Sequence, residues 1–265
     1  TLLFQRFHGL TAVAGVAALL YALDESRGIP SGWVANRNAL VTLFFGVACL
    51  LAHDRWRREK WLPGSILGPL LFTMALLAAE AGIATTAYLL GYALFMDRGP
   101  LWRRLTSLAP FLLIVVIWRL IYNAYDFGAA GSGLYIDPVA HPLRFFVAAI
   151  RRWPLLMAGQ WISAPTIIIS FLPPVIISTI IAISVVFMGG IGLLLRPILQ
   201  VSASARMWLT GMMLSAIPIC ATFPANRLLG FVGLGGAALL AQLADHYGRP
   251  GLTWLRQRGG GLPHP

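Results

Sequence analysis

The chain has 265 residues, of which 58% are hydrophobic and only 11% are charged, and its mean hydropathy is +0.77. A water-soluble domain carries about 25% charged residues, so the composition excludes an ordinary soluble enzyme and indicates a polytopic helical membrane protein. The formal net charge of +11 could indicate a nucleic-acid partner. Because the basic residues cluster beside apolar runs, as they do on the cytoplasmic side of membrane spans, we expect no nucleic-acid partner.

About 20 apolar residues cross a bilayer as a helix. On this measure the apolar runs predict an all-α fold with about eight transmembrane helices. In chain order the predicted spans cover residues 10–23 with an extension over 2–7, 33–52, two short spans within 62–96, then 106–122, 175–195, 207–222 and 228–243.

The run over residues 62–96 is the least regular of these segments. As one helix it would be about 52 Å long, which exceeds a hydrocarbon core of about 30 Å. Glu80 interrupts it near the middle, within LLAAEAGIATTAYLL. We therefore expect two short helices that meet at residues 79–82, with Gly82 in the left-handed conformation that such a turn needs.

Between the spans lie several polar segments. Residues 53–60 and 97–105 are predicted to be basic loops. Residues 123–142 form a glycine-rich stretch whose irregular backbone cannot face lipid. Residues 143–153 place Arg144, Arg151 and Arg152 on a face apart from their apolar neighbours, which predicts a helix lying in the membrane interface; a further short span is the alternative.

The basic residues predict the orientation. With residues 53–60 in the cytoplasm, alternation places thirteen of the twenty basic residues on that side, in line with the positive-inside rule. The opposite, outer face then holds residues 24–38, the Glu80 turn, residues 123–164, the bend at Pro173 and the turn FPANR. We expect residues 1–247 to form a single transmembrane domain and residues 248–265 to be a disordered cytoplasmic tail.

Acidic residues on the predicted outer face are candidates for chemistry. Ionisable groups inside membrane segments are usually functional, so Glu80 either binds and positions a substrate or serves as a hydrogen-bonded turn residue. Asp24 and Glu25 follow the first span and are either loop residues or partners of Glu80 in an acidic pocket. Asp137 lies in the glycine-rich stretch, where capping a helix or contacting water is the alternative to a chemical role.

A second group of candidates suits an anionic ligand. Trp33, Asn36 and Arg37 stand just before a span, where a guanidinium and helix N-terminal amides can share a phosphate. The alternative is that Trp33 and Arg37 are ordinary interface anchors. Arg227 lies in the FPANR turn and is a second candidate phosphate ligand. No nucleotide or metal motif is present, so we expect no cofactor, although dependence on a divalent metal stays open.

Several stretches together resemble a known family. They are W-x-A-N-R-N-A-L-x-x-L-F-F before a span, the acid-broken helix pair around Glu80, the glycine-rich segment, and a late R-L-L-x-F-x-G-L-G helix. This pattern resembles the integral-membrane glycosyltransferases of the GT-C superfamily, above all the O-mannosyltransferase-like group that carries tetratricopeptide repeats, and its uncharacterised bacterial relatives. The resemblance covers most of the chain, and the Arg37 and Glu80 stretches carry most of it.

The resemblance implies transfer of a sugar from a polyprenyl-phosphate lipid to an acceptor at the outer face of a bacterial inner membrane. It assigns acid roles to Glu80, Glu25 and Asp24, and substrate-binding roles to residues that include Arg37 and Arg227. The family's usual catalytic acid lies in a first outer loop that has no counterpart here, and its repeat tail is also missing. We therefore expect either part of a longer protein, which lacks the first span and loop, or a catalytically reduced relative.

Two other classes fit the same composition. A transporter or flippase of a lipid-linked sugar would spread polar groups through its spans, often in paired half-sequences. A non-catalytic membrane scaffold related to the transferases would tolerate the loss of Glu80 and Arg37. The sequence leaves the sugar, the acceptor and the oligomeric state open.

Overall fold

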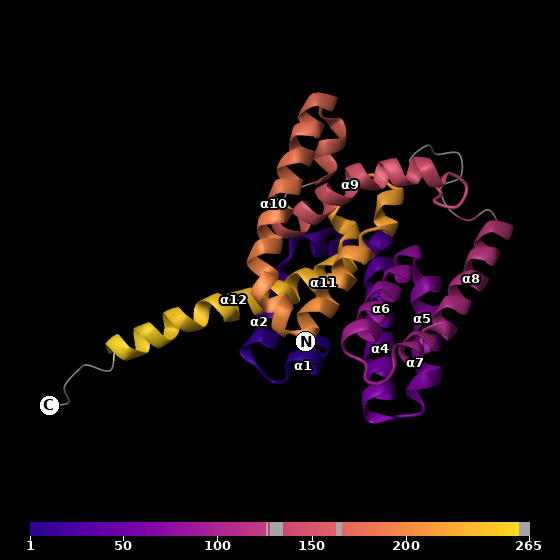
Figure 1. The fold of residues 1–265 in the computed structure, drawn as a ribbon. Helices are drawn as coiled ribbons and strands as arrows, with labels where there is room; N and C mark the ends of the chain where they lie inside the picture. The colour runs from indigo at the N-terminus through magenta and orange to yellow at the C-terminus, as the bar shows by residue number, and fades with distance from the viewer. Residues whose placement is uncertain (126, 128–134, 163–165, 260–265) are drawn as a thin grey trace.

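The computed structural model describes the backbone of residues 1–125, 127, 135–162 and 166–259, and the side chains of all of these except 27, 170 and 249–259. This part of the chain is helical and contains no strand, which confirms the all-α prediction for it (Figure 1). Its α-helices are α1 (Leu2–His8), α2 (Ala12–Leu23), α3 (Gly28–Gly32), α4 (Asn38–Glu59), α5 (Gly64–Ala78), α6 (Thr85–Phe95), α7 (Leu101–Thr106), α8 (Ala109–Ala124), α9 (Pro142–Ile162), α10 (Pro174–Val201), α11 (Ala203–Ser215) and α12 (Gly230–Gly259).

Short 3-10 helices connect these elements. Their bounds are η1 (Glu25–Arg27), η2 (Val34–Asn36), η3 (Glu80–Ala84), η4 (Thr166–Phe171), η5 (Pro218–Ala221) and η6 (Asn226–Leu228).

Among the residues that the structure describes, three helical segments are long and apolar enough to cross a membrane, which makes the chain an integral membrane protein. They are Val34–Glu59, Leu101–Ala124 and Pro174–Val201, with 26, 24 and 28 residues. The helices α2 and α5 are apolar but shorter, with 12 and 15 residues. The lengths therefore support membrane insertion, and they do not confirm a count of eight spans.

The helices pack as a bundle with one helix laid across its end. α4 pairs with α5, while α11 packs against α6 and α12, and α12 packs against α2. α8 lies at one edge of the bundle next to α5, and α9 crosses the end of the bundle at the top of Figure 1. α10 packs mainly against α9 and leaves much of its apolar surface uncovered; Val186 and Leu193 are 76% and 70% exposed.

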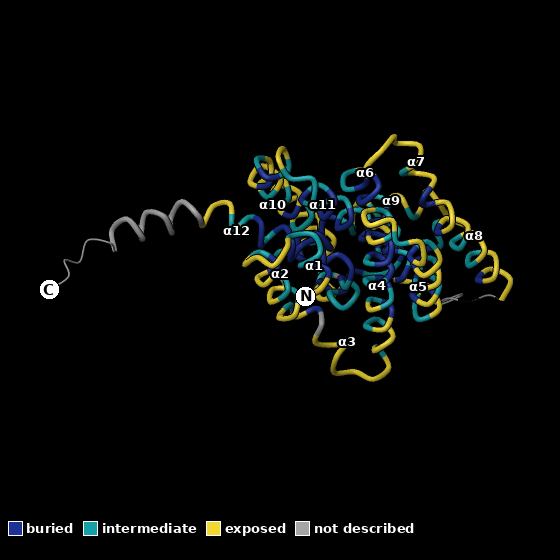
Figure 2. Tube along the Cα trace, turned by 90° about the horizontal axis from the view of Figure 1, so that it is seen from below, coloured by how far each residue is buried: buried dark blue, intermediate teal, exposed yellow. Residues whose placement is uncertain are grey.

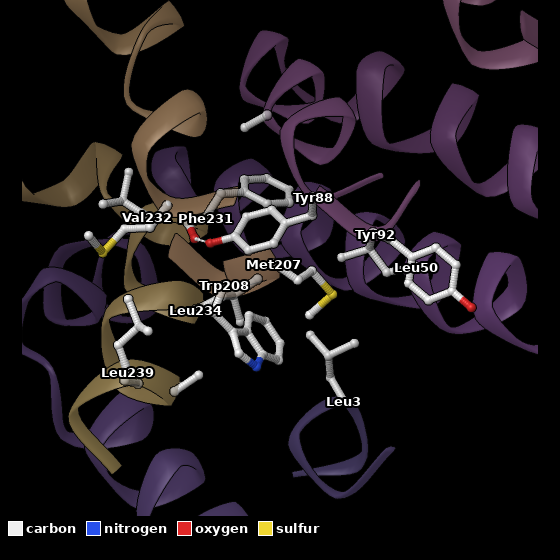
Figure 3. Packing of buried hydrophobic residues seen from close by; sticks show 14 of the residues in the cluster. Leu3, Leu50, Tyr88, Tyr92, Met207, Trp208, Phe231, Val232, Leu234 and Leu239 are labelled. Carbon is white, nitrogen blue, oxygen red and sulfur yellow. Dashed lines mark hydrogen bonds between the residues drawn. The ribbon is translucent and has the colours of Figure 1, made fainter. Parts of the chain in front are cut away.

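The centre of the core is built around two aromatic side chains. Trp208 on α11 is fully buried and packs against Phe4, Phe7 and Tyr88. The Tyr88 hydroxyl donates to the carbonyl oxygen of Phe231 at 2.5 Å, which ties α6 to α12 (Figure 3). Because a buried hydroxyl without a partner is costly, this bond fixes the relative position of these two helices.

Small residues permit this close approach. A Cβ added at Gly211 would lie 2.2 Å from the Tyr88 ring, and one at Gly235 would lie 2.6 Å from the Trp208 carbonyl oxygen. Gly211 and Gly235 therefore serve close helix packing.

The structure corrects three local predictions. Residues 53–59 are not a loop, because α4 continues through Glu59. Residues 2–23 are not one continuous helix, because Gly9 adopts a φ of 71° and separates α1 from α2. Gly82 is not left-handed; a Cβ there would lie 2.6 Å from the Ala75 backbone, so its role is close packing of η3 on α5.

The predicted interfacial helix is longer than expected. α9 runs to Ile162, nine residues beyond 153, and residues 154–160 are buried in the bundle. Only its first half is the exposed, arginine-bearing surface helix that the sequence predicts. Figure 2 shows the same contrast across the bundle, with buried residues at its centre and exposed residues along α8 at its edge. At the other end of the chain α12 continues as a helix to Gly259, and the predicted disordered tail stays a prediction.

Candidate functional site

Segments far apart in the chain meet at the end of the bundle that α9 covers. The amide of Ile136 donates to the Ala221 carbonyl at 2.8 Å, and Arg152 donates to the Cys220 carbonyl at 2.9 Å. η5 in turn contacts η3, and η6 contacts η1 and α3. This end, which we call the α9 end, therefore brings together the five features that the sequence places on the outer face.

One polar cluster at the α9 end contains two predicted acids. Asp24 caps η1 by accepting from the Ser26 amide at 2.9 Å, and it accepts from Gln160 Nε2 at 2.7 Å. Glu25 accepts from Asn226 Nδ2 at 2.6 Å. The Asn226 Oδ1 atom accepts from the Thr166 hydroxyl at 2.7 Å, so amide side chains from α9 and η6 hold both acids.

This first cluster also has polar atoms without partners. Gln160 Oε1 and Ser26 Oγ are buried and have no hydrogen bond within the described part of the chain. Buried polar atoms are normally satisfied, so both atoms are open to a ligand or to water. Arg227 lies above the Trp33 ring with its Cζ 5.9 Å from the ring centroid, so the structure brings both of these predicted residues to the edge of the cluster.

A second cluster surrounds Glu80. The Tyr122 hydroxyl donates to Glu80 Oε1 at 2.5 Å, and Arg119 on the same face of α8 forms an ion pair with Asp137. Tyr135 lies between the two pairs: burial raises the pKa of Tyr135, and the charges of Glu80 and Asp137 raise it further. η3, α8 and the segment before α9 thus supply one connected set of side chains.

The charge of Asp137 is stabilised in this set. Burial by itself raises the pKa of Asp137, but hydrogen bonds from Arg119 and from the amides of Val139 and Ala140 outweigh burial and hold the pKa below its ordinary value. Asp137 is therefore the ionised partner of Arg119 and the cap of the turn before α9. Its predicted role in substrate binding stays a prediction.

An apolar groove of about 690 Å³ opens beside Glu80. Glu80 and Tyr122 are polar side chains at one end of it, and Thr73 lines it two turns earlier on α5. The other lining residues are Leu76, Leu77, Ala79, Ile114, Ile117, Trp118, Ile121 and Phe127. The groove runs between α5 and α8, so a long apolar chain can lie in it with its polar end at the carboxylate.

Arg37 is the predicted residue that the structure leaves apart. It is exposed at the start of α4 and makes no ion pair within the described residues. Thr42, one turn later, donates to the Ala75 carbonyl at 3.3 Å, which places this part of α4 beside the end of α5 that precedes Glu80. Asn36 points its amide nitrogen into a buried position with no partner in the described residues. Arg37 thus lies at the α9 end without a contact to either cluster.

Sequence reasoning missed several members of these clusters. Arg119 is the one charged residue within the predicted span over 106–122, and an ionisable residue inside a span is a signal that points to function. Gln160 has no such signal, because a single amide within an apolar helix is common, and Asn226 stands in the FPANR turn, where asparagine is an ordinary turn residue. Asp126, another polar residue of the glycine-rich stretch, lies outside the described residues.

The described residues contain no group of three His, Cys, Asp or Glu side chains that could hold a metal ion. Comparison of the chain with family models, with curated proteins and with solved structures finds no match. The geometry of the two clusters and of the groove is therefore the basis for a functional conclusion.

Proposed function

We propose that the chain is a membrane glycosyltransferase of the GT-C type, which moves a sugar from a polyprenyl-phosphate lipid to an acceptor hydroxyl. The observation that supports it best is the Glu80 carboxylate at the polar end of an apolar groove of about 690 Å³. A polyprenyl chain is a long apolar ligand with a polar end, and the groove has the same distribution of apolar and polar surface. The acceptor, the sugar and dependence on a metal are not part of the proposal.

Glu80 is positioned to act as a general base. Tyr122 occupies Oε1, and Oε2 has no hydrogen-bond donor among the described residues, so Oε2 can accept the proton of an acceptor hydroxyl. The acceptor oxygen attacks the anomeric carbon, the bond from that carbon to the phosphate oxygen breaks, and the electron pair leaves with the lipid phosphate. The Arg37 guanidinium and, beyond it, Arg227 are the candidates that neutralise this phosphate.

The acids of the first cluster have a different role in this proposal. Asp24 and Glu25 are hydrogen-bonded to amide side chains, which leaves the open atoms of Gln160 and Ser26 beside them. Such a cluster suits the hydroxyl groups of a sugar or an acceptor, because hydroxyls both donate and accept. We therefore assign Asp24 and Glu25 to substrate binding rather than to proton transfer.

The proposal includes the finer topology. Eight spans, with the α9 end outward in a bacterial inner membrane, place both clusters at the outer surface, where a carboxylate costs much less than at the bilayer centre. The helices α2, α5, α6 and α11 have 11–15 residues, fewer than the 17 or so of a full perpendicular span. Each of these four helices crosses the bilayer only if the flanking 3-10 helices and turns span the remaining thickness.

Glu80→Gln tests the proposed role directly. Full-length chain in native membranes is supplied with a radiolabelled sugar on polyprenyl phosphate, and transfer of label out of the lipid fraction is measured together with the melting temperature. Loss of the general base should reduce the rate about 100-fold or more with little change in melting, since Gln can still accept from Tyr122. Normal transfer with normal melting would refute the role, and Tyr122→Phe should lose far less activity than Glu80→Gln.

A flippase of a lipid-linked sugar is the second candidate, and one observation favours it. Polar groups are not confined to the α9 end, because Asp54 and His53 are buried at the opposite end of α4. A transporter needs polar groups along its path. Reconstituted chain that moves a fluorescent polyprenyl-phosphate sugar between leaflets, and that does not transfer the sugar, would select this function; a non-catalytic scaffold would do neither.

A further inference from the structure

A second groove at the α9 end has a composition unlike that of the Glu80 groove. It encloses about 610 Å³ between α9 and the start of α10. Three of its lining residues are arginines, namely Arg144, Arg151 and Arg152, and its other lining residues are apolar or proline, among them Ile177, Ile181 and Phe223.

The arginines of this groove have no carboxylate partner. None of the three forms an ion pair within the described residues, and the sequence contains no Asp or Glu between residues 138 and 244. Arg152 donates one hydrogen bond, to the Cys220 carbonyl. The acid nearest in sequence, Asp137, is already paired with Arg119. Positive charge in this groove is therefore not compensated from within the described chain.

Neighbouring like charges make this arrangement unfavourable without an anion. Burial lowers the pKa of Arg152, and the charge of Arg144 also acts to lower it. Arg144 and Arg151 are seven residues apart, two turns of a helix, so both lie on the face of α9 that Arg152 adjoins. A phosphate can accept from two guanidinium groups at once, which removes the repulsion and satisfies the donors.

The apolar part of the groove continues along a lipid-facing helix. Ile177 and Ile181 are four residues apart and line the groove from one face of α10. Val185, four residues further on, continues this row and is 54% exposed. A chain that leaves the groove along this row therefore meets apolar surface at the next turn of α10.

We propose that this groove binds one anionic phospholipid of the surrounding bilayer, with its phosphate at Arg144, Arg151 and Arg152 and an acyl chain along Ile177 and Ile181. The charge selects an anionic headgroup, and the apolar wall selects a lipid over a free anion. The inference does not rest on the transfer reaction, because the groove is lined by none of the residues assigned to it.

The test measures lipid binding by the purified full-length chain. The chain in detergent is titrated with phosphatidylglycerol or with phosphatidylcholine, and the retained lipid is counted by native mass spectrometry. Wild-type chain should retain one phosphatidylglycerol in preference to phosphatidylcholine. Arg144→Gln and Arg151→Gln should each weaken this binding roughly fivefold, on the scale of one basic residue near an anionic surface, and the double variant roughly twenty-five-fold if the effects add.

The controls separate this site from general charge effects. Arg196→Gln removes an exposed arginine from the far end of α10 and should leave binding unchanged, while Arg151→Lys keeps the charge and should retain part of it. Arg152 is left intact, because its bond to Cys220 also supports the fold. Equal retention of both lipids, an equal effect of Arg196→Gln, or displacement of phosphatidylglycerol by equimolar inorganic phosphate or polyprenyl phosphate would each overturn the proposal.

Discussion

The two ends of the bundle differ in the partners of their charged side chains. At the end away from α9, which we call the basic end, Arg6 pairs with Asp54 and Glu59, and Arg57 pairs with Asp97 at 2.8 Å. At the α9 end Glu25 and Glu80 accept hydrogen bonds from neutral amide and hydroxyl groups, while the groove arginines have no described acid partner. At the basic end the acids Asp54, Glu59 and Asp97 are each paired with an arginine. At the α9 end Asp137 is paired with Arg119, whereas Glu25, Glu80 and the groove arginines form no ion pairs with each other within the described residues.

This difference has a physical consequence. Charges that neutralise each other inside the chain stabilise a helix junction, and they gain little free energy from binding a ligand of opposite charge. Charges that are separated gain most from an external group of opposite sign or from a hydroxyl. The α9 end is therefore the part of this molecule that is suited to binding, and the basic end is suited to holding α1, α4 and α6 together.

Cysteine labelling tests on which side of the membrane each end of the bundle lies, and it gives an all-or-none result. In a chain whose native Cys49 and Cys220 are replaced by alanine, Val139→Cys samples the α9 end and Leu62→Cys samples the basic end; both positions are exposed. An impermeant maleimide added to intact cells should label Val139→Cys, and should label Leu62→Cys only after permeabilisation, because basic residues remain in the cytoplasm. The reverse pattern would place the α9 end inside and remove the outer-face proposal.

Asp54→Asn should give the largest change in stability. The Asp54 side chain is 0% exposed, while its partners Arg6 and Arg58 are 25% and 39% exposed. Removing one partner of a buried pair costs about 3–5 kcal/mol, and we expect the lower part of that range because solvent can reach both guanidinium groups. The unfolding free energy is measured by titration with SDS from mixed micelles.

Glu25→Gln is the matched control at the α9 end. Glu25 is exposed and accepts from an amide, so the change should stay within about 0.5 kcal/mol, as surface substitutions usually do. Similar losses for Asp54→Asn and Glu25→Gln would mean that the two ends do not differ in how they use their acids.

Sequence patterns predicted the helices and the gathering of the Glu80, FPANR and glycine-rich segments, because apolar run lengths and alternation between sides depend only on local composition. They did not predict that residues 53–59 are helical. Arg57 is held by Asp97, forty residues away, and Asp54 is held by Arg6. In a sequence, the charged end of a helix whose ion-pair partners lie far away along the chain cannot be distinguished from a solvated basic loop.

The same limit applies to the candidate site. The sequence predicts Glu80 as a site residue because a single acid in an apolar run stands out from its neighbours along the chain. Its partner Tyr122 gives no such signal, because an aromatic residue is ordinary in a span. The sequence predicts a left-handed conformation at Gly82, yet the glycine is needed for the contact with Ala75. A sequence shows that a glycine is present and does not show whether a conformation or a neighbour requires it.

The ion pair between Asp137 and Arg119 should give the smallest change in stability. It tests the comparison of the two ends because it is an acid paired with an arginine within the α9 end. The pKa of Asp137 is held below its ordinary value of 3.8, so the pair contributes stability that is fully present above the unfolded-state pKa. That stability is lost as the pH falls through the lower folded-state pKa, when the carboxylate takes up a proton. Between pH 7 and about 5 we therefore expect no change from this group.

Melting temperature measured from pH 7 to pH 3 in wild type and in Asp137→Asn checks this expectation. The two curves should run parallel above about pH 5 and converge towards pH 3, because only wild type loses the pair. Both side chains are about a quarter exposed, and solvent screening keeps such pairs small, typically below about 1 kcal/mol. Curves that stay parallel down to pH 3 would show that Asp137 gains nothing from Arg119. Arg119 would then be available to the Glu80 groove, and the α9 end would contain one further uncompensated arginine beside the proposed base.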